Sequence, residues 1–204
     1  MKIRFTKGEL KRQRDDLRQF QRYLPTLQLK KQQLQIEILH QRKSLEEKKQ
    51  DARANKETVL VWAKLLAEPQ VNLRPWVRPK KIAIDVRNVA GVEVPVFKGC
   101  EFNPAEYDLF ITPLWVDGAV EALRIQASLR AEISVLEQGE EVLKTELRIT
   151  TQRVNLFEKI KIPQAKEAIR KIKIYIGDQT ANAVGRSKIA KRKIEELLLQ
   201  GAIA

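Results

Sequence analysis

One row of apolar residues recurs every seven positions through the first third of the chain. Eight of its nine members are apolar. The row reads Leu10, Leu17, Leu24, Lys31, Ile38, Leu45, Ala52, Val59 and Leu66. A second row, three residues further on, is apolar at four of eight positions. A long seven-residue repeat on a narrow stripe is typical of a helix that packs on one partner helix. The pattern predicts a helix from about Thr6 to Ala67, with Pro25 bending or locally opening its first turns.

The pattern changes between Pro69 and Pro113, a stretch that holds six of the eight prolines. The runs Lys81–Val86 and Val92–Phe97 alternate with a period of two, and Asn88–Gly91 supplies a turn between them. These signals predict a short β-hairpin. Because an isolated hairpin is only marginally stable in water, it must pack on the helices or on a partner. We expect the aromatic and apolar residues of this stretch to form a small core and part of a docking patch; they are Trp76, Val77, Phe97, Phe102, Tyr107, Phe110 and Trp115.

A second helix is predicted from Pro113, with Thr112 as its N-cap, to about Leu199. Its apolar seam is Leu129, Ile133, Leu136, Glu140, Leu143, Leu147, Thr150, Val154 and Phe157. Past Pro163 the seam slips by one position, to Ala165, Ile169, Ile172 and Ile176. Gly177 and Gly185 weaken the last part of the helix.

Two long helices that leave one small head must run antiparallel, so the numbers of facing residues should add up to about 180. This register places Leu45 near Val135, Leu17 near Pro163 and Met1 near Gln179, and it leaves Thr180 onward as a single projecting helix. We expect a mainly α chain: two long helices in an antiparallel coiled coil, joined by a small head with a β-hairpin. The expected parts are residues 1–68, 69–112 and 113–204.

The formal net charge of +13 lies at the two ends of the chain. Residues 1–68 hold 17 basic and 9 acidic residues, and residues 163–204 hold 9 and 4. The antiparallel register brings these ends together as a basic tip. Its main members are Arg12, Arg14, Arg18, Lys188, Lys191 and Arg192. Three interpretations stay open: binding to nucleic acid, seating in an acidic protein socket, or a plain solvated surface.

The sequence contains no catalytic constellation. His40 and Cys100 are single residues, and neither has partners at metal-ligand spacing. Neighbouring carboxylates such as Glu140–Glu141 are expected to be solvated helix charges. We therefore expect no enzyme activity, no cofactor and no metal. The charged N-terminus does not resemble a signal peptide, and no apolar run is long enough to span a membrane, so a soluble cytosolic protein is expected.

Four short segments resemble the D subunit of V-type (vacuolar or archaeal-type) ATP synthases. Arg153–Glu158 reads R-V-N-L-F-E, similar to the family's R-V-N-x-x-E. Ile162–Pro163 follows, and then Ile169–Lys173 resembles I-x-x-I-K. In the head, Gly91–Pro95 resembles G-V-x-V-P. The order helix, head, helix covers the whole chain.

The resemblance implies a non-catalytic rotor shaft at the centre of the complex. Its termini would insert into the hexamer of catalytic and regulatory nucleotide-binding subunits. Its head and lower part would hold the small F subunit and sit on the funnel subunit above the membrane ring, peripheral to the membrane. The residues expected to carry this role on the shaft are Arg153, Asn155, Glu158, Pro163 and Lys173. Those expected to bind partners in the head are Val86, Gly91, Val92, Val94, Pro95 and Phe97. The alternative is a basic coiled-coil protein that binds nucleic acid or acts as a scaffold.

Overall fold

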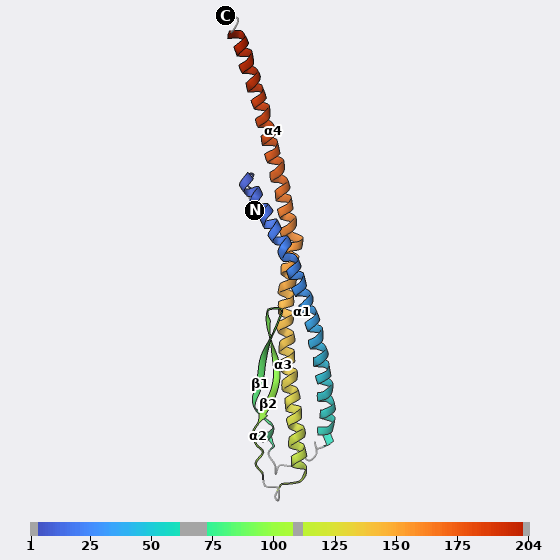
Figure 1. The fold of residues 1–204 in the computed structure, drawn as a ribbon. Coiled ribbons are helices and arrows are strands. Elements are labelled where there is room, and N and C mark those ends of the chain that lie inside the picture. Colours follow the sequence, from blue (N-terminus) through green and yellow to red (C-terminus); the bar gives the residue numbers. More distant parts are fainter. Residues whose placement is uncertain (1–3, 62–72, 108–111, 202–204) are drawn as a thin grey trace. The chain divides into compact units, whose positions relative to one another are not determined.

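The structure, a computed structural model, describes residues 4–61, 73–107 and 112–201 (Figure 1). Its elements are α1 (Lys7–Val61), α2 (Arg74–Val77), β1 (Pro79–Val89), β2 (Val92–Phe102), α3 (Trp115–Asn155), the π-helical turn η2 (Leu156–Lys161) and α4 (Ile162–Gly201). Long helices precede and follow an antiparallel hairpin along the chain, which confirms the predicted fold class. The predicted end of the first helix near Ala67 lies outside the described residues.

The chain forms two compact units. The terminal unit comprises Met1–Gln28 and Gln152–Ala204, and the head unit comprises Leu29–Thr151. In the terminal unit, the beginning of α1 lies beside α4 (Figure 1). In the head unit, the remainder of α1 and the hairpin both lie beside α3. Each unit is therefore built on a pair of helices.

The two seven-residue rows on α1 are the faces that the helix buries. Every described member of both rows is buried or half-buried, including the polar ones, Gln13, Lys31, Gln41, Lys48 and Asn55. Two polar members bond to backbone carbonyls of α3: the Gln41 amide donates to the Leu136 carbonyl at 3.2 Å, and the Asn55 amide donates to the Ala122 carbonyl at 3.2 Å. The second row, which has fewer apolar members, therefore also faces the partner helix, and its polar residues Gln41 and Asn55 are hydrogen-bonded there.

Contacts between facing helices confirm the predicted antiparallel register. In the head unit, Lys48 lies 3.2 Å from Glu132. In the terminal unit, the ring centroids of Phe5 and Tyr175 are 4.9 Å apart, and those of Phe20 and Phe157 are 5.3 Å apart. The residue numbers in each pair add up to about 180, as expected. Met1, predicted near Gln179, is outside the described residues.

The hairpin is longer than predicted, and its turn is tight. β1 and β2 pair antiparallel from Pro79–Phe102 to Val89–Val92. Ala90 and Gly91 form the two-residue connection with positive φ angles of 51° and 78°. Two positive φ values are typical of the turn that matches the twist of paired strands. Asn88 stabilises the turn, since its Oδ1 accepts a hydrogen bond from the Gly91 N–H at 3.0 Å.

Two local features differ from the expectations, and a third leaves its expectation untested. The short helix α2 was not predicted; Pro75, at one of its first positions, suits a helix start. α3 begins at Trp115 rather than Pro113, although the Val116 N–H donates to the Pro113 carbonyl at 3.1 Å. α1 runs through Pro25 without a break in its helical assignment. The expected bend at Pro25 stays a prediction.

The tip of the hairpin packs into the helix pair at Gly139 of α3. Val94 is buried with Leu34, Ile38 and Leu143. A Cβ atom at position 139 would lie 2.7 Å from Gln41 Nε2 and 3.1 Å from Val94 Cγ1. Glycine in a helix costs about 1 kcal/mol relative to alanine, so its presence here reflects the close approach of the hairpin and of Gln41.

We predict that Gly139→Ala and Gly177→Ala change stability in opposite directions. Gly177 also lies in a helix, but a Cβ atom there would meet nothing within 4 Å. Gly177→Ala should therefore stabilise its helix by up to about 1 kcal/mol. Gly139→Ala should destabilise the head unit by about 1–2 kcal/mol, because the added methyl group would displace the buried Gln41 amide from its hydrogen bond to the Leu136 carbonyl and press against Val94. Denaturant unfolding followed by circular dichroism measures both changes. Equal stabilisation by the two variants would contradict the packing described above.

Candidate partner-binding surfaces

A series of ion pairs joins α1 to α3 in the head unit, always with the cation on α1. The pairs are Lys30–Glu146 at 2.8 Å, Arg42–Glu140 at 2.6 Å, Lys48–Glu132 at 3.2 Å and Lys49–Glu137 at 2.8 Å. Exposed pairs of this kind contribute little stability one by one. Their common direction nevertheless favours one partner face and one register, because sliding α1 along α3 would separate every pair.

The expectation that Glu140 is a solvated helix charge is wrong, since it is the most buried carboxylate of this series, with its side chain 12% exposed. It accepts a hydrogen bond from Arg42 Nε at 2.6 Å and lies 2.8 Å from Lys144 Nζ. The hydrogen bonds from Lys144 and then from Arg42 lower the pKa of Glu140 below its ordinary value of 4.5, against the opposing effect of burial. The carboxylate is thus held in its charged form between two cations, at the level where the hairpin packs.

We predict that Glu140 contributes to acid unfolding. Because its pKa is lower in the folded chain than in the unfolded chain, its stabilisation is present above about pH 4.5 and is lost as the pH falls through its folded pKa. Glu140→Gln should reduce stability at neutral pH and flatten the loss of stability on the acid side. The neighbour Glu141 is exposed and makes no ion pair with the described residues, so Glu141→Gln is the matched control. Thermal melts from pH 3 to pH 7 test this, and identical acid profiles for both variants would contradict the role of Glu140.

The hairpin has a covered part and an exposed apolar part. Val94 is 1% exposed, and Val92 packs against the same core, so this chain itself covers both side chains. Ile82, Ile84 and Val86 alternate along β1 and are exposed. The other residues expected to bind partners lie near the turn: Gly91 is exposed, and Pro95 and Phe97 are half-buried. Among the head residues named from the sequence, Val86 is therefore the apolar side chain most open to a partner.

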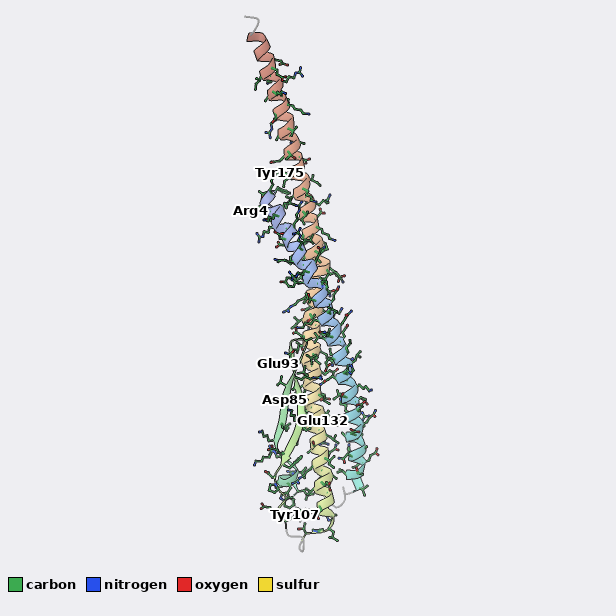
Figure 2. All side chains as sticks on the ribbon, viewed as in Figure 1. Arg4, Asp85, Glu93, Tyr107, Glu132 and Tyr175 are labelled. Carbon is green, nitrogen blue, oxygen red and sulfur yellow. The ribbon has the colours of Figure 1, made fainter. Side chains whose placement is uncertain are left out.

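One ion pair joins the hairpin to α1, and another joins its two strands to each other. Arg87 at the end of β1 pairs with Glu37 of α1, and Lys98 of β2 lies 2.7 Å from Asp85 of β1. Asp85 and Glu93 mark the middle and the tip of the hairpin in Figure 2. The hairpin is thus tied to α1 as well as packed on it, which fixes the direction in which Ile82, Ile84 and Val86 point.

The base of the head unit is organised by Arg124, which sequence reasoning missed. Its guanidinium donates to the Trp76 carbonyl at 2.9 Å and to the Asn103 carbonyl at 2.6 Å. It also lies 5.5 Å from the centre of the Phe102 ring. Tyr107, labelled in Figure 2, packs on Trp76 with ring centroids 5.0 Å apart. Trp76 and Tyr107 thus pack on each other, and Arg124 contacts the Trp76 backbone and the Phe102 ring, in line with the small core expected for the head.

An apolar groove runs along the flank of α1 in the head unit. Ile36 and Leu39 are 56% and 64% exposed, and Leu29 lies one heptad before Ile36 on the same stripe. The groove has a volume of about 600 Å³. Its lining also includes Gln32, Gln35, Ile38, Arg42, Lys144 and Leu147. The seven-residue spacing of Leu29 and Ile36 is the signal that could have identified this second, outward stripe from the sequence.

The five motif residues on the second helix all point outward. Arg153, Asn155, Glu158, Pro163 and Lys173 are exposed, whereas Val154 and Phe157 between them face α1. None of the four polar motif residues has a hydrogen bond or ion pair from its side chain within the part of the chain that the structure describes. The motif therefore combines two inward apolar residues with an outward polar surface that has no side-chain partner among the described residues.

A π-helical turn separates α3 from α4 inside this motif. Proline has no N–H, and its ring would collide with the carbonyl four residues earlier in a regular helix. Before Pro163 the helix widens over Leu156–Lys161, and the Ile162 N–H bonds to the Phe157 carbonyl five residues back. A π turn takes up one extra residue. This extra residue explains why the seam slips by one position at Pro163.

The residues expected at the basic tip fall into two groups. Arg14 and Arg18 line a groove on α1, and Arg12 is exposed beside them. On α4, Lys191 pairs with Glu195 at 3.7 Å and Arg192 with Glu196 at 3.0 Å, one helical turn apart, while Lys188 is exposed. No hydrogen bond or ion pair between described residues joins the two groups. From Gly177 to Glu196 every residue except Gly185 is exposed, in agreement with an unpaired helix there.

No helix among the described residues is both long and apolar enough to cross a membrane. The same residues contain no group of three or more His, Cys, Asp or Glu side chains placed to hold a metal ion. Four surface features of the described residues are open to a partner: the exposed strand β1, the α1 groove, the outward motif and the basic residues.

Comparisons with known proteins agree over nearly the whole chain. A family model for the D subunit of ATP synthase matches residues 9–192. The D subunit of the V-type ATP synthase of Borreliella burgdorferi is 44% identical over 193 residues, which are 95% of each chain. The protein of the same description from Chlamydia abortus is 35% identical over 95% of this chain and 94% of the relative. That of Chlamydia pneumoniae is 33% identical over 96% and 94%.

Proposed function

Because this chain belongs to the family of ATP synthase D subunits, we propose that it is the central rotor shaft of a V-type ATP synthase. As a member of that family it is a non-catalytic component of a rotary ATPase, and its partners are other subunits of the complex. In the proposed role, ion flow turns a membrane ring and the shaft with it. The turning shaft then drives the catalytic sites of the surrounding hexamer through successive states, and ATP hydrolysis reverses the motion.

The feature that most supports this role is the combination, within each unit, of a seam between two helices with outward surfaces whose polar groups have no partner among the described residues. A shaft that transmits torque must not let its two helices slide or twist past each other. Within the head unit, the seam of Leu34, Ile38 and Leu143 and the ion pairs to α3 oppose such sliding. A two-stranded coil supplies this stiffness with a thin cross-section.

The proposal assigns the exposed end of α4 to the hexamer of catalytic and regulatory nucleotide-binding subunits. The helix is exposed on all sides from Arg186 to Glu196 and carries long charged side chains there. Such side chains remain hydrated and suit a surface that must turn inside the hexamer without binding tightly to it. The apolar residues Ile189 and Ile194 are exposed among them and offer short-range contacts to the inner surface of the hexamer.

A reversible cross-link distinguishes a rotor from a static scaffold. The single cysteine is first removed as Cys100→Ser, and Lys193→Cys then introduces one thiol on the exposed part of α4. A cleavable maleimide photo-cross-linker should join this site to the hexamer. For a rotor we expect ATP turnover to fall about tenfold or more on linking and to recover on cleavage, because a covalent tie stops rotation.

The matched control places the thiol on the hairpin instead, as Lys80→Cys in the same Cys100→Ser background. Lys80 is also exposed, but it lies in the head unit, which the proposal does not assign to the hexamer. The control should give no link to the hexamer and full turnover. If linking through residue 193 leaves turnover unchanged, the chain does not rotate against the hexamer and the proposed role is wrong.

For the head unit we propose binding to the small F subunit of the central stalk and to the funnel subunit above the membrane ring. The α1 groove is the surface that best suits a helix of the small F subunit. It presents Ile36 and Leu39 beside the aliphatic Leu147, and Arg42 and Lys144 border it. An amphipathic helix could bury these apolar groups against its own.

We predict that Leu39→Glu weakens binding of the small F subunit at least about tenfold, since a charge would have to be buried in the apolar groove. Leu60→Glu is the control. Leu60 occupies the same heptad position three repeats later, and its exposure of 57% compares with 64% for Leu39. Isothermal titration with the purified partner measures both. Equal affinities of the two variants would exclude the groove as the contact, while leaving the rotor role itself open to the cross-linking test.

A further inference from the structure

The cations of α1 are used differently in the two units. In the head unit, Lys30, Arg42, Lys43, Lys48 and Lys49 each pair with a carboxylate of this chain. In the terminal unit, none of the α1 cations has an ion pair with the described residues; they are Lys7, Lys11, Arg12, Arg14, Arg18 and Arg22. The same helix thus neutralises many of its charges internally in one unit and leaves them unpaired in the other.

Four of the unpaired cations lie along one groove. Lys7, Lys11, Arg14 and Arg18 follow each other at intervals of four, three and four residues, which places them on one face of the helix. The groove has a volume of about 480 Å³, and its lining is completed by Leu10 and Asp15 of α1 and by Ile176 of α4. Four cations against the single carboxylate of Asp15 make it strongly positive, with an apolar strip beside the charges.

This arrangement works against the stability of the helix that carries it. α1 begins at Lys7, where the helix dipole is positive and a cation is disfavoured. The start is nevertheless fixed, because Thr6 Oγ1 accepts a hydrogen bond from the Glu9 N–H at 3.2 Å, as in a capping box. Repulsion between cations one turn apart adds to the cost. Charges retained at a cost to stability and left without an internal partner indicate an external partner of opposite sign.

We propose that the groove of Lys7, Lys11, Arg14 and Arg18 binds a carboxylate-rich protein surface that lines the opening of the nucleotide-binding hexamer. This inference rests on the proposed rotor function and adds the chemistry of the contact. Aspartate and glutamate side chains would pair with the four cations, and an apolar side chain would rest on Leu10 and Ile176. Attraction between opposite charges steers the chain into the opening and then holds its N-terminal end there.

The composition of the described groove lining favours protein over nucleic acid as its occupant. Single-stranded nucleic acids bind to basic grooves through rings on which bases stack. The groove lining contains no aromatic ring among the described residues. In the same unit, Phe5 and Tyr175 pack on each other, with ring centroids 4.9 Å apart, and Phe20 packs on Phe157.

The test compares two full-length variants that each remove four positive charges. The groove variant carries Lys7→Gln, Lys11→Gln, Arg14→Gln and Arg18→Gln. The control variant carries Arg53→Gln, Lys56→Gln, Lys80→Gln and Lys81→Gln, at exposed cations of the head unit that have no ion pair with the described residues. Circular dichroism confirms that both remain helical. The association rate with the purified nucleotide-binding hexamer is then measured by biolayer interferometry over a range of salt concentrations.

At low salt we expect the groove variant to associate about tenfold or more slowly than the unmodified chain, with a weaker dependence on salt. The control should stay within about twofold of the unmodified chain. A third variant with Lys7→Arg and Lys11→Arg keeps the charges and should bind normally. Equal rates for the groove and control variants would overturn the inference while leaving the rotor function in place.

Two other outcomes would also be decisive. Failure of the unmodified chain to bind the hexamer would remove the proposed function, and this inference with it. If the groove variant binds the hexamer normally but loses binding to a DNA duplex that the control variant retains, the occupant is nucleic acid and the inference is wrong.

Discussion

Side chains from two seven-residue rows of α1 interlock with the helix that runs antiparallel beside it, and this packing positions the other elements of each unit. In the head unit the rows meet α3 around Leu34, Ile38 and Leu143. In the terminal unit they meet α4 around Ala165 and Ile172. Apolar contacts alone would tolerate a shift of one heptad. The polar members of the rows and the ion pairs directed from α1 to α3 make one register preferable to its neighbours.

The hairpin depends on the same packing. A two-stranded sheet has too little apolar surface to be stable alone. Its Val94 is buried because the two helices come close enough to form one core with it, and Gly139 provides the space for that approach. Once Val92 and Val94 are covered by the helices, Ile82, Ile84 and Val86 are left exposed. The packing inside the unit thus determines which side of the head is available to partners.

Much of the fold could be predicted from the sequence because the packing of long helices produces a repeating pattern of apolar residues. The row from Leu10 to Val59 identified the buried face, and the position of the head between the two helices predicted the antiparallel register. The pattern could not show which valines of the hairpin would be covered, because alternation defines two faces without saying which one meets the helices. It also gave no sign of the π-helical turn beyond a slip of one position. The basic groove needed the structure, since an unpaired cation and a paired one look alike in a sequence.

The π-helical turn has a consequence for any attempt to exchange segments between related chains. One extra residue between Leu156 and Lys161 keeps the downstream seam in phase. A graft that supplied a regular α-helical turn of the same length would rotate everything after it by about 100°. Ala165 and Ile172 would then point away from α1, and the outward surface of Lys173 would turn inward. The stretch from Val154 to Ile172 therefore has to be exchanged as a whole, because its proline, its wide turn and its seam are compatible only with one another.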